Sequence, residues 1–539
     1  MNFTALPTLG DLVSGVRMLT RLPPILRRPL TSEEARATLH DHLMNRERNF
    51  LTLARDGIYG NSRSPYRRLL ESVGCAYGDL ERLVQKEGLE SALHSLYTQG
   101  IYLTVDEYKG RRPVVRGQMK FLIGSADLHN PGLRLDMFGR TSSSRGPGTV
   151  VPMDYAAHRK YSADVFLEIE ARGGWDWQRA IWLTPGSGAL SRVMGYTFCG
   201  TRLDRWFFLV EPKAAGLHPR YFRSAQALRL AAKLAGVWLP RPEFVGLQDP
   251  LPIARWIEGV LRAGKTPHLQ AYASCVVRIC QTALERGINL KGARFTMGGE
   301  PITAARFAIV RQVGAEALVR YATSDASVLG LGCAAPQAPD DVHFLHDRCA
   351  MVQPGANSAA GLPPNTLLLT TVRPKARLIL FNVSLGDQAV VSQRDCGCSL
   401  EKLGWTRHLH TIRSFEKLTA GGVALLDADI VGLLEETLPR RFGGGPTDYQ
   451  LIDEESPDGK PRVRLLVHPR LGPMDPAEVR KAFLDGIGPG SGAERVMMLV
   501  WRDAGLPIIE RKAPRVTSGG KILHVHLDRP NRLSVNNAD

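Results

Sequence analysis

The sequence lacks the features that mark several broad classes of protein. No uninterrupted apolar stretch reaches transmembrane length, and the first thirty or so residues contain no small-residue cleavage site. No internal repeat is present, and basic and aromatic residues do not interleave in the way that stacks nucleic-acid bases. We therefore expect a cytoplasmic protein, and in a cytoplasmic chain of 539 residues the 8 cysteines do not form a disulfide framework.

Basic residues are in excess. Lys and Arg number 69 against 53 Asp and Glu, which gives a formal net charge of +16. Such a charge raises the concentration of anions near the surface, so nucleotides, CoA, acidic carrier proteins and nucleic acids all qualify as ligands. Because no nucleic-acid-binding module is recognisable, we expect no nucleic-acid partner; a basic nucleic-acid-associated protein would rest on charge alone.

The N-terminal segment alternates arginine and leucine over residues 17–30. This pattern could contact an anionic membrane or a partner. Pro23, Pro24 and Pro29 interrupt it, and they favour a solvated lead-in segment, so we expect no peripheral membrane contact. The oligomeric state stays open, with a dimer as one alternative.

The pattern along the chain predicts an α/β fold with more than one domain. Thr31 and Glu34 have capping-box spacing before a helical stretch, so residues 1–118 read as the helical N-terminal region of a large domain. Residues 119–412 alternate helix and strand and then become rich in strands between about 366 and 393, which predicts a core with a β-rich subdomain. Residues 413–539 read as a small α+β domain.

Several elements are predicted in detail. Residues 267–286 read as one helix ending at Gly287, 293–297 as a strand, and 303–313 as a helix. The segment 377–383 reads as a strand, and so does 496–501 in the C-terminal domain.

The Ser, Thr and Gly loop at 141–149 follows a predicted strand. Backbone amides in such a loop can surround phosphate oxygens, although taken alone an ordinary polar surface loop is the commoner explanation. The residues proposed to bind phosphate there are Thr141, Ser142, Ser143, Ser144, Arg145 and Gly146.

A second group of candidates lies further along the chain. The turn Gly299-Glu300-Pro301 follows a strand, where glycine allows close approach to a flat ligand. Tyr321 ends the next predicted strand and could stack on adenine, and Ser324 follows it. Asp325 could hold Mg²⁺. Each has an ordinary alternative as a turn residue, core aromatic or cap.

The common order of these fragments resembles the adenylate-forming enzymes, and within that superfamily the phenylacetate-CoA ligase group. That group carries a T-S-G-S-T-G-x-P-T type loop, a G-E-P turn, Y-G-x-S-E, a ribose-binding Asp, a G-R-x-D-D hinge and a late G-K. The corresponding segments here are TSSSRGPGT, Gly299-Glu300-Pro301, YATSD at 321–325, Asp387, residues 412–422 and Gly520-Lys521. The resemblance covers the chain from about 140 onward.

The resemblance implies a ligase that activates a small carboxylic acid with ATP and Mg²⁺ and passes the acyl group to CoA; loading of an acyl-carrier protein is the alternative. Lys521, brought over by a mobile C-terminal domain, would meet the α-phosphate and the carboxylate. Asp387 would bind the ribose, and Arg413 would assist from the domain boundary. Departures from the pattern at Ser143, Arg145, Ala322, Asp325 and Phe415 also admit a catalytically weak nucleotide-binding relative.

The resemblance also implies a structural zinc ion. In the phenylacetate-CoA ligase group similar Cys, His and Cys-x-Cys placements hold zinc, and the matching residues here are Cys333, His343, Cys396 and Cys398, with Cys349 as an alternate ligand. Three thiolates and one imidazole suit tetrahedral zinc. From spacing alone, buried free cysteines are at least as good an explanation as a zinc site. The remaining cysteines read as core residues.

Overall fold

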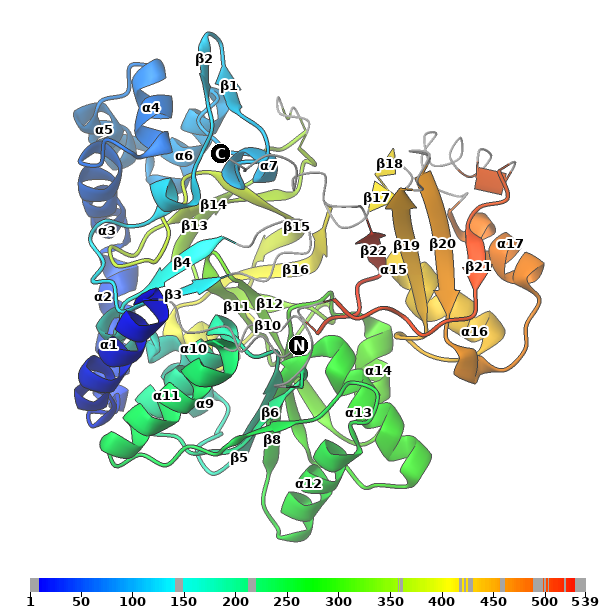
Figure 1. Ribbon diagram of the computed structural model, residues 1–539. Coiled ribbons are helices and arrows are strands. Elements are labelled where there is room, and N and C mark those ends of the chain that lie inside the picture. Colours follow the sequence, from blue (N-terminus) through cyan, green and yellow to red (C-terminus); the bar gives the residue numbers. More distant parts are fainter. Residues whose placement is uncertain are drawn as a thin grey trace.

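The computed structural model of the chain describes residues 9–140, 149–211, 220–356, 358, 362–415, 419–420, 423–424, 430–455, 461–487, 498, 501–502, 504–517 and 520–528. These residues form two units, each built around its own sheet (Figure 1). The larger unit has a 12-stranded sheet and the smaller a four-stranded sheet. The predicted α/β class, with a large first part and a small α+β second part, is confirmed.

Helices dominate the N-terminal part of the larger unit. Thr31 and Glu34 form the predicted capping box at the start of α2, because the Thr31 side chain accepts from the Glu34 amide and the Glu34 carboxylate accepts from the Thr31 amide. The helices are α1 (Leu9–Leu26), α2 (Ser32–Met44), α3 (Arg46–Leu53), the π-helical η1 (Ala54–Tyr59), α4 (Pro65–Ser72), α5 (Tyr77–Glu87), α6 (Leu89–Thr98) and α7 (Val105–Tyr108).

The segment expected as a solvated lead-in is instead the helix α1. Its Met18, Leu22 and Leu26 are buried, and the helix packs against α11 (Arg220–Leu234). Pro23 and Pro24 lie in the last turn of the helix. Because proline has no backbone N–H, the helix lacks the hydrogen bonds that these two positions would donate, but only near its end. Burial of the apolar side chains of α1 stabilises the helix by more than those missing hydrogen bonds cost.

The large sheet combines a parallel and an antiparallel half. Strands from β10 to β7 in the sheet order pair in parallel, and those from β13 to β10 pair antiparallel. In sheet order the strands are β13 (Cys349–Val352), β14 (Thr366–Thr371), β15 (Val383–Gln393), β16 (Arg407–Ser414), β12 (Val342–Phe344), β11 (Ser327–Gly332), β10 (Glu316–Thr323), β9 (Arg294–Gly298), β8 (Pro267–Tyr272), β5 (Gln178–Leu183), β6 (Leu203–Phe208) and β7 (Pro242–Phe244). The β-rich segment thus continues the main sheet.

Two details of this region differ from the prediction. Residues 267–272 form strand β8 before α13 begins, because they occupy an interior position of the parallel half between β5 and β9. Residues 377–382 do not form a strand; Asn382 has a φ of 47° and donates from its side chain to the Leu93 carbonyl, which bends the chain before β15. The helix ends at Gly287 as predicted, and Gly287 caps it in the left-handed conformation.

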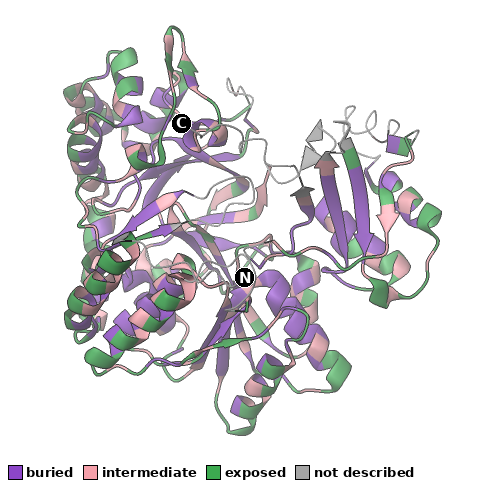
Figure 2. Cartoon of the chain, in the orientation of Figure 1, coloured by how far each residue is buried: buried purple, intermediate pink, exposed green. Residues whose placement is uncertain are grey.

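Helices cover both faces of the parallel half (Figure 1). The strands are mostly buried, whereas the helices expose one side, as Figure 2 shows. The helices are α8 (Tyr155–Tyr161), α9 (Ala163–Ala171), α10 (Ser187–Phe198), α11, α12 (Leu251–Arg262), α13 (Ala273–Arg286) and α14 (Ala304–Gln312). Short elements complete the unit: β1 (Val114–Arg116), β2 (Met119–Phe121), η2 (Ser125–Leu128), β3 (Met137–Arg140), β4 (Val150–Met153) and η3 (Glu401–Leu403).

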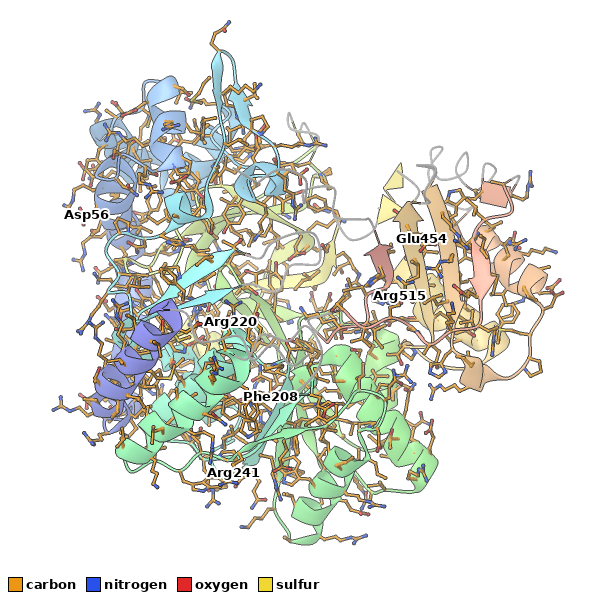
Figure 3. All side chains as sticks on the ribbon, viewed as in Figure 1. Asp56, Phe208, Arg220, Arg241, Glu454 and Arg515 are labelled. Carbon is orange, nitrogen blue, oxygen red and sulfur yellow. The ribbon has the colours of Figure 1, made fainter. Side chains whose placement is uncertain are left out.

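The smaller unit has its own apolar core. Figure 3 shows its side chains, with Glu454 and Arg515 labelled. Its elements are β17 (Thr419–Ala420), β18 (Val423–Ala424), α15 (Ile430–Gly432), η4 (Leu433–Thr437), α16 (Leu438–Phe442), β19 (Tyr449–Glu455), β20 (Pro461–Val467), η5 (Pro469–Leu471), α17 (Pro476–Ile487), β21 (Ile508–Glu510) and β22 (Val525–Asp528).

One prediction in the smaller unit is wrong. A strand was expected at 496–501, but the described residues Met498 and Trp501 are helical. Among the described helices, none is both long enough and apolar enough to cross a membrane.

Candidate functional site

Two cavities meet where parallel strands of the large sheet end. The larger has a volume of about 640 Å³ and the smaller about 250 Å³. Ligands of α/β sheets bind in this position, beyond the carboxyl ends of the strands. Both cavities are lined by Gly299, Arg320, Ala322, Thr323, Ser324, Asp325 and Lys521.

The glycine turn after β9 brings the end of the chain close to the sheet. Gly299 has a φ of 75°, and a Cβ atom built on it would lie 3.0 Å from the Tyr272 ring and 3.2 Å from Lys521 Nζ. Any other residue would therefore displace Lys521 and strain the backbone. Lys521 Nζ itself lies 5.1 Å from the centre of the Tyr272 ring, within cation–π range.

Glu300 holds the segment that carries Lys521. Its Oε1 accepts from the Ile522 amide at 2.8 Å and from the Ser274 hydroxyl at 2.9 Å, while Oε2 accepts from the Ser274 amide at 2.6 Å. The Glu300 side chain is fully buried and also contacts Arg306 at 3.3 Å. In this arrangement Glu300 joins the two units.

A buried ionic network continues this junction. Arg306 Nε donates to Glu435 Oε1 at 2.7 Å, and Thr303 donates to the other oxygen of Glu435. His524 Nε2 lies 2.6 Å from Glu435 Oε1. Burial acts to raise the pKa of Glu435, but the charges of Arg306 and His524 prevail and lower it to about 2. Residues of α14 thus bind residues of the smaller unit through paired charges.

The smaller cavity contains the predicted nucleotide-binding residues Glu300, Pro301, Tyr321, Ser324, Asp387 and Arg413. The Tyr321 hydroxyl donates to Asp387 Oδ2 at 3.0 Å, and burial followed by the charge of Asp387 raises the pKa of Tyr321. Arg413 Nη1 donates to Asp340 Oδ2 at 2.9 Å. The structure therefore brings together residues that are distant in the sequence.

Asp325 has a partner that the sequence did not indicate. Lys109 Nζ lies 3.0 Å from each of its carboxylate oxygens, and the Tyr108 hydroxyl donates to Oδ1 at 3.1 Å. Lys109 also donates to the Thr149 hydroxyl at 2.9 Å. Because an ammonium ion already pairs with both oxygens, this geometry does not fit Asp325 as a Mg²⁺ ligand unless Lys109 moves away.

The predicted phosphate loop lies outside the described residues at Thr141, Ser142, Ser143, Ser144, Arg145 and Gly146. Its flanks are placed: β3 and β4 pair antiparallel, with Arg140 opposite Val150. Gly139, before the loop, and Val151, after it, both line the larger cavity. The strands on either side of the loop therefore border that cavity.

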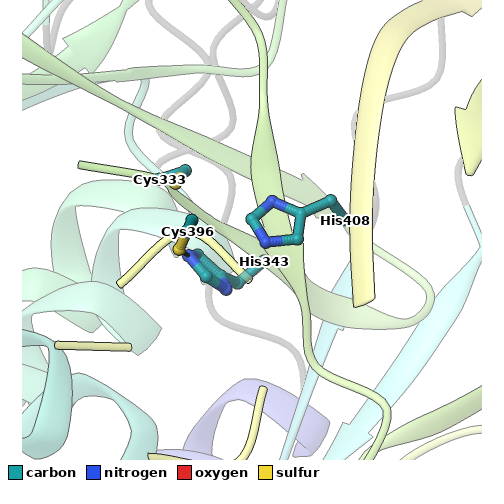
Figure 4. Close-up of side chains that lie close together, drawn as sticks. All are labelled: Cys333, His343, Cys396 and His408. Atoms are coloured by element: carbon teal, nitrogen blue, oxygen red, sulfur yellow. Dashed lines mark hydrogen bonds between the residues drawn. The ribbon is translucent and has the colours of Figure 1, made fainter. Parts of the chain in front are cut away.

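A cluster of cysteine and histidine side chains lies between β11, β12 and β16. Ligand atoms of Cys333, His343, Cys396 and His408 all lie within 4.8 Å of one another (Figure 4). Cys398 Sγ lies 3.1 Å from His343 Nε2. The four predicted zinc ligands are thus neighbours, and His408 adds a fifth donor that the sequence spacing did not reveal.

The surroundings of the cluster suit a metal ion. His343 Nδ1 lies 2.6 Å from the Trp405 carbonyl and His408 Nδ1 lies 2.8 Å from Asp341, which leaves each Nε2 as the ligand atom. His408 Nε2 is buried without a hydrogen-bond partner among the described residues. Thiolate and imidazole donors fit zinc, which takes four ligands. Cys349 is buried on β13 and lines the larger cavity instead.

No protein-family model matches the sequence, and no curated protein matches it. Among solved structures, a 2-hydroxyisobutyryl-CoA ligase in complex with 2-HIB-AMP and CoA is 13% identical, with a TM-score of 0.41 and coverage of 95% of this chain and 90% of its own. The anthranilate CoA ligase AuaEII is 11% identical, with a TM-score of 0.41 and coverage of 72% and 66%. O-succinylbenzoate CoA synthetase from Bacillus subtilis is 12% identical, with a TM-score of 0.39 and coverage of 72% and 69%. At TM-scores below 0.5 these likenesses assign no activity to this chain.

Proposed function

We propose that this chain is an adenylate-forming ligase that activates a carboxylic acid with ATP and transfers the acyl group to a thiol. The observation that carries the proposal is the position of Lys521. This residue comes from the C-terminal segment, yet it lines both cavities at the ends of β8, β9 and β10. A cation at that junction can meet a nucleotide bound on one side and an acid bound on the other.

In the first half-reaction a carboxylate oxygen attacks the α-phosphorus of ATP, and the bond to the β-phosphate oxygen breaks to release pyrophosphate. Negative charge increases on the phosphoryl oxygens, and a fixed cation such as Lys521 stabilises it. Asp387, held by Tyr321, would accept from the ribose hydroxyls in the smaller cavity. Arg413, positioned by Asp340, would assist there, and the loop 141–146 would bind the outer phosphates.

Lys109 supplies a second cation near the phosphate loop, because it bridges Asp325 and Thr149. The assignment of Asp325 to Mg²⁺ stays a prediction. Lys109 itself can reduce the repulsion between phosphate oxygens and the Asp325 carboxylate.

In the second half-reaction the thiol sulfur attacks the acyl carbon and AMP leaves. We propose CoA as the thiol, with an acyl-carrier protein as the alternative acceptor. Access would require the smaller unit to turn about the segment near Arg413 to Phe415, which breaks the contacts of Glu300 and Glu435. We propose the domain boundary at residue 413, because the turning segment would lie there. The last strand of the large sheet in chain order, β16, ends close by at Ser414.

The finer assignment to the phenylacetate-CoA ligase group is supported by the cysteine and histidine cluster. Cys333, His343 and Cys396 lie together, as that resemblance implies, with Cys398 and His408 beside them. A zinc ion held there would join β11, β12, β16 and the loop after β15, and would stabilise the fold without touching the substrate.

ATP–pyrophosphate exchange with a panel of aryl and aliphatic acids tests the proposal. We expect at least one acid to support exchange, and Lys521→Ala to lower the rate by about 10²-fold or more while the circular dichroism spectrum is kept. Lys265→Ala, at an exposed position, is the matched control. Absence of exchange with every acid, together with retained ATP binding, would favour a weak nucleotide-binding relative.

A further inference from the structure

Basic side chains outnumber acidic side chains along the wall of the larger cavity. Seven lysine and arginine side chains line it, against three aspartates. Three of the arginines are each paired with a buried carboxylate: Arg320 with Glu168, Arg348 with Asp164 and Arg373 with Asp347. These pairs are internal to the fold and leave little charge for a ligand.

Arg192 differs from those three. Six residues of α10 line the cavity, and five of them are small: Ser187, Gly188, Ala189, Ser191 and Gly195. Arg192 is the single long side chain on that stretch of wall. Within the part of the chain that the structure describes, it makes no salt bridge, and its guanidinium lies 5.7 Å from the centre of the Tyr196 ring.

Burial, and then the neighbouring charge of Arg320, lowers the pKa of Arg192 to about 10. Arg377, which lines the same cavity and donates to Ser327 at 2.7 Å, has its pKa lowered to about 10 by burial and by Arg348. Both arginines are half-exposed and line the cavity, and neither makes a salt bridge with a described carboxylate, so each can pair with an anion bound there.

Arg192 and Lys521 each lie beside an aromatic ring that is on β8 or contacts it. The Tyr196 hydroxyl, on the ring beside Arg192, donates to Gln270 at 3.0 Å, and Tyr272, the ring beside Lys521, follows two residues later. Gln270 and Tyr272 face the same side of the sheet and both line the cavity. Arg192 and Lys521 therefore line one cavity beside neighbouring positions of β8.

We propose that the acid activated at this site carries a second anionic group, such as a second carboxylate, that pairs with Arg192 while the reacting carboxylate meets Lys521. The inference rests on the proposed function, since it names the substrate class of that site. A planar guanidinium binds a carboxylate through two parallel hydrogen bonds, so it fixes orientation as well as charge. An acid without the second group would leave Arg192 without a salt bridge in the cavity.

Direct binding tests the inference without requiring turnover. Calorimetry compares α,ω-dicarboxylates of four to ten carbons and the three benzenedicarboxylates with their monocarboxylate counterparts. At least one diacid is expected to bind about 10²-fold more tightly than its monoacid. Arg192→Gln removes that advantage, so that the diacid binds no more tightly than its monoacid, whereas Arg192→Lys retains part of it. Arg262→Gln, an exposed arginine on α12, makes the same charge change away from the cavity and has no effect.

The outcomes separate this inference from the proposed function. If monoacids support pyrophosphate exchange and no diacid binds better, the inference is overturned and the function stands. If diacid binding depends on Arg192 but no acid supports exchange, the anion site stands and the proposed activity falls. If Arg192→Gln instead weakens ATP or pyrophosphate alone, Arg192 contacts the triphosphate and the inference is overturned.

Discussion

Replacing Glu300 with Gln tests whether docking of the C-terminal segment controls adenylation. The substitution keeps the shape of the side chain, but it turns one acceptor oxygen into a donor that faces backbone N–H groups of Ile522 or Ser274. A hydrogen bond to a charged group contributes about 1.5–3 kcal/mol, so loss of the Ile522 contact lowers the population of the docked arrangement about 10- to 100-fold. The rate of ATP–pyrophosphate exchange is expected to fall by that factor.

The second half-reaction provides the contrast. Under the proposed mechanism, thioester formation from a chemically prepared acyl-adenylate requires the smaller unit to leave this arrangement, so Glu300→Gln is expected to change the rate of that step by less than about twofold. Ser274→Ala removes only the hydroxyl contact at 2.9 Å and keeps the Ile522 bond, so it is the matched control and lowers exchange only slightly. An unchanged exchange rate, or an equal loss in both half-reactions, would refute the reasoning.

Three other perturbations give separate checks. Lys109→Met should lower pyrophosphate exchange about 10-fold or more because an ammonium near the phosphate loop is lost, and added Mg²⁺ should restore part of the rate; an unaltered rate and Mg²⁺ dependence would contradict this role. Cys396→Ser should reduce bound zinc, measured by elemental analysis, and lower the unfolding temperature, while Cys75→Ser keeps the metal content; equal metal in both variants would count against the site. The pKa of Glu435 is lowered from 4.5 to about 2, so its stabilising contribution is complete above pH 4.5 and is lost as the pH falls toward 2. Urea unfolding of the wild type should show this loss, and Glu435→Gln should not.

The parts of the site that could be predicted are those that follow strand ends. Glycine and acidic residues after apolar strands indicated the turn at Gly299 and the neighbourhood of Tyr321, and the structure brings Tyr321 to Asp387 across 66 positions. Their roles toward ATP stay predictions, as do those of the loop 141–146. The fold class followed from the alternation of helix and strand. The mistaken helix at 267–272 shows the limit of periodicity, since a short apolar run suits an interior strand equally well.

The residues that sequence reasoning missed act through contacts between distant segments. Lys109 meets Asp325 across 216 positions, and nothing in its local pattern distinguishes it from a surface lysine. His408 lies on a strand opposite His343, so only the register of β12 and β16 reveals it as a ligand candidate. Arg192 stands out only when the cavity wall is known. Each of these three residues is identified by its neighbours in the folded structure and not by its neighbours in the sequence.

The contact between Glu300 and residue 522 uses a main-chain amide rather than a side chain. Evolution could therefore exchange the side chain at 522 among many apolar types without loss of that bond, and proline alone would abolish it. Selection on this junction would act on residue 300 and hardly at all on residue 522, so covariation between the two positions in related sequences would not reveal the contact.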